Sequence, residues 1–374
     1  MEKLHPAMEE ALALAHRAIA LSEPNPRVGC VIVAADGSRV LGSGHTQAAG
    51  QAHAEVQALR DAAARGEDVR GATAYVTLEP CSHHGRTGPC CDALVQAGIA
   101  KVVASLGDPN PLVAGQGFAR LRAAGVAVEV GPGAAESREL NIGFFSRMER
   151  KTPWVRMKIA ASLDGQTALA NGASQWITSE AARADGHAWR GRAGAILTGI
   201  GTVLEDNPRL DIRLWPAPKQ PPLVVVDSRL QTPPDAALFV PGRHVLVYAA
   251  EQHAQAQAAL EARGAEVVYQ AGGPKGKVDL AAMLADLALR EVNEVHVESG
   301  FKLNGSLLRE GLVDELLVYL APKLLGPGQG MVNIGPLQRL DEAVELEFGE
   351  MKAFGPDLRI LAKVKASCQP QVGK

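Results

Sequence analysis

Apolar and polar positions along the first 130 residues follow helical and strand periods in turn. Apolar residues recur at helical spacing over residues 6–21, which predicts an opening helix that ends at Pro24-Asn25-Pro26. Apolar residues at 28–33 and a segment at 39–44, joined by a turn at Asp36-Gly37, predict a β-hairpin. Further helices are expected at 53–65, 90–98 and 116–124, and further strands at 75–77, 101–105 and 126–130. This alternation is typical of an α/β layer.

A second α/β series follows a charged segment that lacks periodicity and ends at Pro153. Strands are expected at 154–160, 195–198, 223–227, 245–248, 294–298 and 315–321, and helices at 252–263 and 280–289. A chain of 374 residues is longer than a single hydrophobic core usually grows. The sequence therefore predicts two domains, residues 1–146 and 153–374, joined by a linker at 147–152.

Composition narrows the classes of protein and partner. Hydrophobic residues make up 47% and charged residues 21%, and no apolar run approaches the ~18 residues that cross a bilayer, so no membrane segment is expected. The N-terminus lacks the order of a signal peptide, which predicts a cytoplasmic protein with reduced cysteines. A net charge of −3 and only 4% aromatic residues argue against a nucleic-acid partner and favour a small-molecule substrate.

Three residues form a candidate metal site, and a fourth gives it a mechanism. His53, Cys81 and Cys90 offer one imidazole and two thiolates, which make three sides of a tetrahedral Zn²⁺ site with one open position for water. Zinc lowers the pKa of bound water from about 15.7 to about 7, and Glu55 can then carry a proton to a leaving amine. The pattern predicts one zinc per chain and hydrolytic deamination.

A closed structural zinc site is the alternative, with His83 or His84 as the fourth ligand and Glu55 as an ordinary helix residue. The second cysteine follows the first after eight intervening residues, where the zinc-deaminase signature has two. The ligand set nevertheless agrees, and Glu55 favours catalysis. Two other hypotheses are a deaminase of nucleic acid or free bases and a zinc-stabilised binding module; neither the acidic charge nor Glu55 favours them.

Two glycine-rich turns follow predicted strands in the second half, at residues 198–202 and 299–306. The second is expected to lead into a helix at Leu307. A strand, a glycine turn and a helix start present free backbone N–H groups, which suit a pyrophosphate. Neither turn has the G-x-G-x-x-G pattern, and many such turns are only tight connections. The pattern alone leaves a nucleotide site and a plain connection both open.

From about residue 5 to 364, the chain resembles the bifunctional deaminase-reductases of riboflavin biosynthesis. The resemblance is carried by Pro24-Asn25-Pro26-Arg27-Val28-Gly29, by His45 with His53-Ala54-Glu55, by Glu79-Pro80-Cys81-Ser82-His83-His84-Gly85-Arg86-Thr87, by Ser162-Leu163-Asp164-Gly165, by Ser174-Gln175-Trp176-Ile177-Thr178-Ser179 and by Asp206-Asn207-Pro208-Arg209-Leu210. Gly88 stands where the family usually has proline.

The resemblance implies a fold and two activities. An N-terminal cytidine-deaminase-like three-layer α/β/α domain would deaminate 2,5-diamino-6-ribosylamino-4(3H)-pyrimidinone 5′-phosphate. A C-terminal dihydrofolate-reductase-like α/β domain would then use NADPH to reduce the ribosyl chain of 5-amino-6-(5-phosphoribosylamino)uracil to ribityl. A homo-oligomer is compatible with the sequence, which does not decide the oligomeric state.

The resemblance also implies site residues. Those matched to substrate contacts are Asn25 and His45 in the first domain and Ser174, Arg190, Leu210, Arg213 and Glu298 in the second. Those matched to NADPH contacts are Ala160, Trp176, Thr202, Asp206, Ser228, Gly300, Phe301, Lys302, Leu303, Asn304, Gly305 and Ser306.

Residue chemistry supports these assignments in part. Arg190 and Arg213 can grip a phosphate bidentately, and Ser228 with Arg229 would accept a 2′-phosphate, although Asp227 beside them would not. Lys158 is a further candidate for orienting the ribosyl chain. Taken singly, Arg190 also fits a solvated helix residue, Asp206 an N-cap, and Trp176 a core residue.

Overall fold

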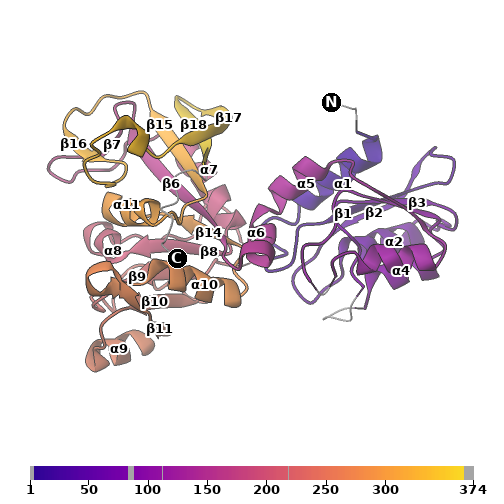
Figure 1. Ribbon diagram of the computed structural model, residues 1–374, viewed down its shortest axis with the longest axis horizontal. Coiled ribbons are helices and arrows are strands. Elements are labelled where there is room, and N and C mark those ends of the chain that lie inside the picture. Colours follow the sequence, from indigo (N-terminus) through magenta and orange to yellow (C-terminus); the bar gives the residue numbers. More distant parts are fainter. Residues whose placement is uncertain (1–3, 83–87, 112, 218, 366–374) are drawn as a thin grey trace. The chain divides into compact units, whose positions relative to one another are not determined.

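The computed structural model describes residues 4–82, 88–111, 113–217 and 219–365. The chain folds into two compact units, Met1–Thr152 and Pro153–Lys374 (Figure 1). Helix α6 (Ile142–Arg150) occupies most of the segment expected to be a linker, so that only residues 151–153 separate it from the next strand. Its last turn is held by Arg150, whose Nη2 donates to Ser146 Oγ at 2.6 Å.

The first unit contains a five-stranded mixed sheet in the order β2-β1-β3-β4-β5. Its strands are β1 (Gly29–Val33), β2 (Val40–His45), β3 (Thr73–Val76), β4 (Lys101–Ala104) and β5 (Ala127–Val130). β1 is antiparallel to both β2 and β3, which confirms the expected hairpin, and β3, β4 and β5 are parallel.

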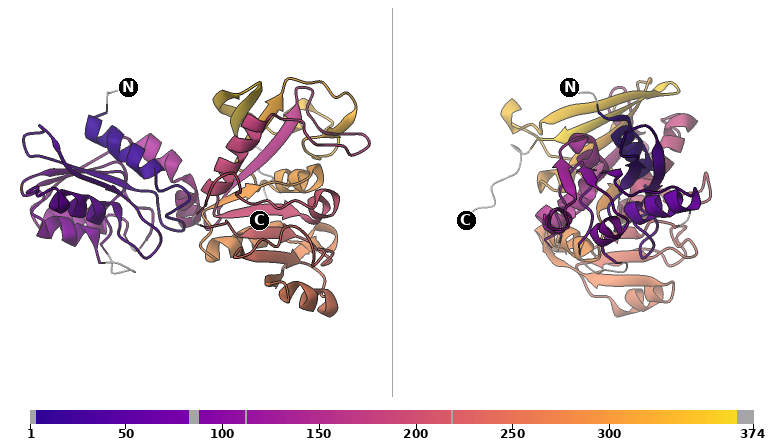
Figure 2. Two further views of the ribbon diagram at one scale, coloured as in Figure 1. Left: turned by 180° about the vertical axis from the view of Figure 1, so that it is seen from behind. Right: turned by 90° about the vertical axis from the view of Figure 1, so that its right-hand side faces the viewer.

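Helices cover both faces of this sheet and make three layers (Figures 1 and 2). α1 (Pro6–His16) and α5 (Ala134–Leu140) lie on one face, and α2 (Ala54–Ala64), α3 (Cys90–Gln96) and α4 (Gln116–Ala123) on the other. Alternate residues of β1 pack toward opposite layers, with Val31 against α1 and Ile32 against α2. α1 ends at His16, earlier than the expected 21, and the chain continues in turns.

The second unit is built on a nine-stranded sheet in the order β11-β10-β9-β8-β14-β6-β15-β18-β17. The strands from β11 to β15 run parallel, and β18 and β17 add an antiparallel edge. They are β6 (Trp154–Ser162), β8 (Ala195–Gly199), β9 (Leu223–Val226), β10 (Val245–Ala249), β11 (Ala265–Tyr269), β14 (Glu294–Val297), β15 (Glu315–Ala321), β17 (Leu346–Phe354) and β18 (Asp357–Val364). The short strands β7 (Gln166–Leu169) with β16 (Gly328–Gly330), and β12 (Ala271–Gly273) with β13 (Lys277–Val278), form two small ribbons.

Helices also cover both faces of the second sheet. α10 (Leu280–Leu289) and α11 (Phe301–Arg309) pack on one face through residues such as Met283 and Leu307. α7 (Glu180–Arg192), α8 (Ile200–Asp206) and α9 (Ala254–Glu261) pack on the other through Ala182, Val203 and Leu260. Short 3₁₀ turns lie at Pro274–Gly276 and Leu340–Glu342. Within the described residues, no helix is long and apolar enough to cross a bilayer.

The α7-covered face of this sheet carries buried charges. Arg156 on β6 contacts Glu294 on β14 at 2.7 Å and Glu315 on β15 at 2.6 Å, and Arg192 on α7 contacts Glu294 at 2.7 Å. Each charge is paired, since an unpaired buried charge would cost several kcal/mol. The same rows continue to Lys158 in the middle of β6 and to Glu298 directly after β14. Open α/β sheets bind ligands at the carboxyl ends of their strands, where Glu298 lies.

Candidate active sites

The three expected metal ligands converge in the first unit. His53 Nδ1 lies 3.3 Å from Cys90 Sγ and 3.6 Å from Cys81 Sγ, and all three ligand atoms lie within 4.8 Å of one another. A tetrahedral zinc ion with two sulfur ligands and one nitrogen ligand separates its ligands by roughly 3.5–3.8 Å. The residues present therefore fit zinc with an open fourth position.

Local structure presents each ligand. His53 is the N-cap of α2, but its side chain makes no capping hydrogen bond, which leaves the ring for the metal. Cys90 opens α3, and its backbone N–H donates to Cys81 Sγ at 3.3 Å. A hydrogen bond from Cys90 and the nearby His53 lower the pKa of Cys81 to about 4, although burial opposes this shift. Cys81 is therefore a ready thiolate.

Glu79 holds the loop that carries Cys81, and the sequence patterns did not single it out. Its buried carboxylate accepts backbone hydrogen bonds from Gly115 at 2.9 Å, Asp108 at 3.1 Å and Phe118 at 3.2 Å. These bonds tie the cysteine loop to the start of α4. The only sequence signal was its place in the Glu79-Pro80-Cys81 run.

Glu55 lies in the first turn of α2 and is buried. Burial raises the pKa of its carboxyl, and the neighbouring Cys81 raises it further, to about 7. A zinc cation would oppose this shift through its positive charge. A buried carboxyl beside a metal site suits a proton shuttle better than a solvated helix residue does.

The two expected substrate contacts of the first unit are His45, at the end of β2, and Asn25, in the loop before β1. His45 ends β2 opposite Gly29, whose carbonyl accepts from Thr77 N just before the cysteine loop. Burial and Arg17 lower the pKa of His45, which favours the neutral ring. Asn25 lies in the half-buried loop that leads into β1. His83 and His84, the alternative fourth ligands, lie outside the described residues. Gly88 is described, and a Cβ added there would meet no atom of the described residues within 4 Å.

In the second unit the two glycine turns lie together. Thr202 Oγ1 in α8 accepts from Gly300 N at 3.0 Å, and a Cβ on Gly199 would lie 3.0 Å from the Leu303 side chain. The turns after β8 and β14 thus form one cradle at the carboxyl edge of the sheet. Gly300 caps α11 without a side-chain bond, so the first N–H groups of that helix are available to an anion.

The structure corrects the expected extent of the second turn. α11 begins at Phe301, not Leu307, so residues 301–306 are helical. Gly305 is buried, and a Cβ there would lie 1.9 Å from Asn333 O. This glycine allows the helix to approach the 333 segment closely, so a Gly305→Val change would disturb packing before it reached a cofactor. Asn304 and Ser306 likewise bond to Ser299 and to Lys302 O.

Asp227 lies beside Ser228 in the turn after β9. Its buried Oδ2 accepts from Thr232 N and Thr232 Oγ1, each at 2.7 Å, so the carboxylate is held by the protein. Ser228 Oγ accepts from Val278 N at 3.2 Å and keeps its own proton to donate. Arg229 is exposed and pairs with Glu251 at 3.3 Å.

The other expected cofactor residues lie on neighbouring elements. Ala160 is half-buried on β6, and Asp206 is the exposed last residue of α8, not an N-cap. Trp176 is 61% exposed rather than core, and the Arg183 guanidinium lies 4.5 Å from its ring centroid. Lys323 Nζ donates to Ile177 O at 2.9 Å and to Trp176 O at 3.2 Å. Ser174 is half-buried in the same loop.

Glu298 is the expected substrate contact of the second unit to which two basic side chains bind. Arg190 Nε and Nη2 contact its two oxygens at 2.5 and 3.0 Å, and Lys158 Nζ lies at 3.6 Å. Burial disfavours the charged carboxylate, but Arg190 and Lys158 hold the pKa of Glu298 well below its usual value. Arg190 is therefore not a solvated helix residue. The Nε and Nη2 edge of its guanidinium contacts Glu298, and its role as a substrate contact stays a prediction.

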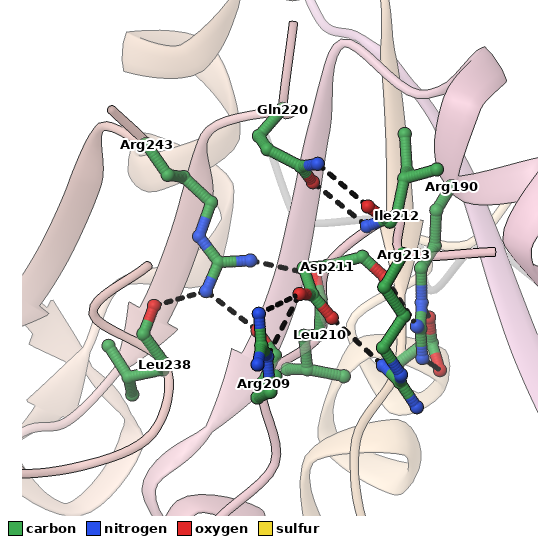
Figure 3. Close-up of polar contacts among 10 residues, drawn as sticks. Arg190, Arg209, Leu210, Asp211, Ile212, Arg213, Gln220, Leu238 and Arg243 are labelled. Atoms are coloured by element: carbon green, nitrogen blue, oxygen red, sulfur yellow. Dashed lines mark hydrogen bonds and ion pairs between the residues drawn. The ribbon is translucent and has the colours of Figure 1, made fainter. Parts of the chain in front are cut away.

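Leu210 and Arg213 lie in an irregular segment after α8 (Figure 3). Leu210 has a positive φ of 50°, and its side chain is buried. Arg213 is 47% exposed and contacts Asp211 at 2.8 Å. Two residues that the sequence patterns missed support this segment, Asp211 and the buried Arg243, both joined to it by hydrogen bonds.

The two sites define a zinc-dependent deaminase joined to an α/β reductase. Residues 1–106 match the family model described as "Cytidine and deoxycytidylate deaminase zinc-binding region", and residues 153–360 match the "RibD C-terminal domain". The chain belongs to the RibD family of bifunctional riboflavin biosynthesis proteins, which use Zn²⁺ and NADPH.

Three relatives illustrate the match. The chain is 45% identical to the riboflavin biosynthesis protein RibD of Escherichia coli over 94% of this chain and 96% of that protein. The structure of Acinetobacter baumannii RibD has a TM-score of 0.85 at 38% identity, covering 96% of this chain and 98% of that one. A Thermotoga maritima structure, titled a diaminohydroxyphosphoribosylaminopyrimidine deaminase/5-amino-6-(5-phosphoribosylamino)uracil reductase, has a TM-score of 0.84 at 30% identity, with the same coverage.

Proposed function

We propose that the first unit deaminates 2,5-diamino-6-ribosylamino-4(3H)-pyrimidinone 5′-phosphate and that the second reduces 5-amino-6-(5-phosphoribosylamino)uracil to its ribityl form. The observation that carries the proposal is the pair of sites in one chain. One is an open His53, Cys81 and Cys90 group beside buried Glu55, and the other is a glycine-turn cradle beside Glu298.

Deamination replaces an amino group on the pyrimidine by oxygen, with water consumed and ammonia released. Zinc held by His53, Cys81 and Cys90 supplies a water that is activated near neutral pH. Glu55 would take a proton from the nucleophile and give it to the departing amine, a role that suits its buried position beside the three ligands. His45 and Asn25 would orient the pyrimidine at the edge of the sheet.

Reduction of the ribosyl chain adds one hydride and one proton. NADPH supplies the hydride, and the chain supplies alignment. The N-terminus of α11 and Thr202 would hold the pyrophosphate, Ala160, Trp176 and Asp206 would border the cofactor, and Ser228 would receive the 2′-phosphate. Glu298 directly follows β14, Lys158 on β6 lies 3.6 Å from it, and both would orient the sugar chain, together with Ser174.

Incubation of the zinc-loaded enzyme with the diaminopyrimidine substrate and NADPH should yield ammonia and the ribityl product. NADH should support reduction at least ten-fold less well, because a charge-assisted hydrogen bond to the 2′-phosphate contributes roughly 1.5–3 kcal/mol. Chromatography of the products and oxidation of each nucleotide measure both steps. Ammonia release without reduction by either nucleotide would overturn the reductase assignment, and equal rates with both would remove Ser228 from the 2′-phosphate site.

We also propose that two copies of the chain pair along β17, the end strand of the large sheet. Phe348 and Met351 on this strand are 64% and 51% exposed. In an antiparallel pair centred between residues 349 and 350, Phe348 would face Met351 of the partner subunit. Glu347 would likewise face the partner's Lys352, so the strand is complementary to itself in charge and in apolar contact.

Sedimentation equilibrium tests this pairing. The wild-type chain should sediment as a dimer, and a Phe348→Asp, Met351→Asp double variant should sediment as a monomer because like charges would meet across the strands. Leu289→Asp is the matched control, since Leu289 is 84% exposed on α10, away from β17. A monomeric wild-type chain, or a dimeric double variant, would refute the pairing.

A further inference from the structure

The loop that carries Asn25 enters β1 through residues whose backbone N–H and C=O groups are both bound. Gly29 N donates to Thr77 Oγ1 at 3.1 Å, and Gly29 O accepts from Thr77 N at 3.1 Å. Val28 N donates to Thr46 Oγ1 at 3.2 Å, and Val28 O accepts from Thr46 N at 2.9 Å. Thr77 directly follows β3 and Thr46 directly follows β2, so these bonds extend the sheet.

Arg27, the next residue outward, is held in the same way by a side chain. Its N–H donates to Asn141 Oδ1 at 2.7 Å, and its carbonyl accepts from Asn141 Nδ2 at 2.9 Å. Asn141 lies 114 positions along the chain, between α5 and α6, and its side chain makes no capping bond to α6. An asparagine amide offers an acceptor and two donors, so it can replace the peptide group of a neighbouring strand.

The α5–α6 junction, residues 137–141, also holds the end of β3. Asn141 Nδ2 donates to Ser137 O at 3.2 Å, and Ser137 Oγ donates to Thr77 O at 2.5 Å. Ser137 and Thr77 are 0% exposed, and Asn141 is 2% exposed. Thr77 comes four positions before Cys81. The junction is therefore bonded both to the loop of Asn25 and to the segment that leads into the cysteine loop.

Two arginines add bonds between this loop and the helices on either side of the junction. Arg27 Nη1 donates to Leu140 O at 2.8 Å, at the end of α5. Arg147 Nη2, on α6, donates to Pro24 O at 3.3 Å. Residues on both sides of Asn25 are thus bonded to α5, to α6 or to the residue between them.

Asn25 itself is held by its backbone and not by its side chain. Asn25 N donates to Ser22 O at 2.8 Å, and Ser22 Oγ donates to Asn25 O at 3.1 Å. Within the described residues, the side-chain amide of Asn25 makes no hydrogen bond. A half-buried amide on a fixed backbone is suited to bind the donors and acceptors at the edge of a pyrimidine ring.

We propose that Asn141 is a positioning residue for deamination, which sets Asn25 at a fixed place relative to the cysteine loop, and that Arg147 assists it. The proposal rests on the proposed function, in which Asn25 orients the pyrimidine. Helix α6, where the sequence predicted part of a linker, then serves the deaminase site, although it lies outside residues 1–106 that match the deaminase family model. A displacement of about 1 Å in a substrate-positioning group can cost about 10²-fold in rate.

A double-mutant cycle tests whether Asn141 acts through Asn25. In Asn141→Ser, kcat/KM for deamination should fall about ten- to a hundredfold, because serine is too short to bind both backbone groups of Arg27. Zinc should stay at one per chain, since the bond from Ser137 to Thr77 remains, and reduction should be unchanged. In an Asn25→Ala background the same change should cost less than about two-fold, because the contact that it displaces is already gone. Equal losses in both backgrounds would mean a general structural role and overturn the proposal.

Arg147→Met is a milder second variant, which removes the donor to Pro24 O and keeps an unbranched side chain. Its kcat/KM for deamination should fall about two- to ten-fold, the loss expected for one hydrogen bond. Arg150→Met is the matched control: Arg150 lies one turn further along α6, and its Nη2 donates to Ser146 Oγ within that helix. It should deaminate normally. Wild-type deamination by both Asn141→Ser and Arg147→Met would overturn the proposal.

Hydrogen exchange separates this proposal from the proposed reaction. In the zinc-loaded chain, the amide of Arg27 should exchange at least about ten-fold faster in Asn141→Ser than in the wild type, while the amides of β4 should not change. Unchanged exchange at Arg27 would overturn the role of Asn141. A wild-type chain in which Asn141 protects this amide, but which releases no ammonia from the diaminopyrimidine, would instead overturn the proposed reaction.

Discussion

Replacing Glu55 with glutamine should leave zinc in place and slow deamination by about 10²–10⁴-fold, the contribution typical of a positioned general acid/base. The carboxamide keeps the shape of the side chain but cannot carry a proton. Glu55 is not one of the three residues whose ligand atoms converge, so metal content should not change. Zinc per chain by atomic absorption and ammonia release under saturating substrate measure the two properties separately.

The same variant should reduce the deaminated substrate at the wild-type rate, because Glu55 belongs to the first compact unit and the reductase residues to the second. Glu9→Gln is the matched control: it changes a first-turn glutamate of α1, which is exposed. This control should deaminate normally. Near-normal deamination by Glu55→Gln with full zinc would favour a structural zinc site over a catalytic one.

The zinc site was predictable because its chemistry is written in residue types. One imidazole and two thiolates, from His53, Cys81 and Cys90, predict zinc as the metal, and Glu55 predicts hydrolytic deamination. Neither prediction needs knowledge of the fold. What the sequence could not supply was the environment. Burial by the folded chain raises the pKa of Glu55. The three backbone N–H groups that donate to Glu79 belong to a segment about 30–40 residues further along the chain.

Glycine was the ambiguous signal in the second unit. The sequence suggests a turn at both Gly300 and Gly305. In the structure Gly300 caps α11, whereas Gly305 lies inside this helix. A glycine that permits a close approach looks the same in sequence as one that permits a turn, since both need the missing Cβ. The partner that decides the matter, Asn333, lies far along the chain.

The partners of charged residues could not be predicted from the sequence, for a related reason. Arg190 could be read as solvated because its partner Glu298 is 108 positions away. Arg243 gave no signal at all, because the groups it binds are backbone carbonyls that every residue possesses.

Replacing Cys81 with serine should abolish both zinc binding and deamination. Zinc binds the thiolate, and the pKa of Cys81, lowered to about 4, makes this side chain the ready anion of the site. A serine hydroxyl stays protonated and offers only a neutral oxygen. Zinc affinity should therefore fall by more than the roughly 10–100-fold that follows loss of a residue that only supports a ligand. Competition with a chromogenic chelator measures this affinity.

Cys91→Ser provides the matched control, because Cys91 is adjacent to a ligand but its thiol contacts Asp92 and it is not among the converging residues. That variant should keep one zinc per chain. Cys81→Ser should still bind NADPH and reduce the deaminated pyrimidine, since the second unit has its own core and carries all the expected cofactor contacts. Full zinc occupancy in Cys81→Ser would refute the ligand assignment, whereas loss of reduction together with deamination would show that the first unit must be intact for the second to work.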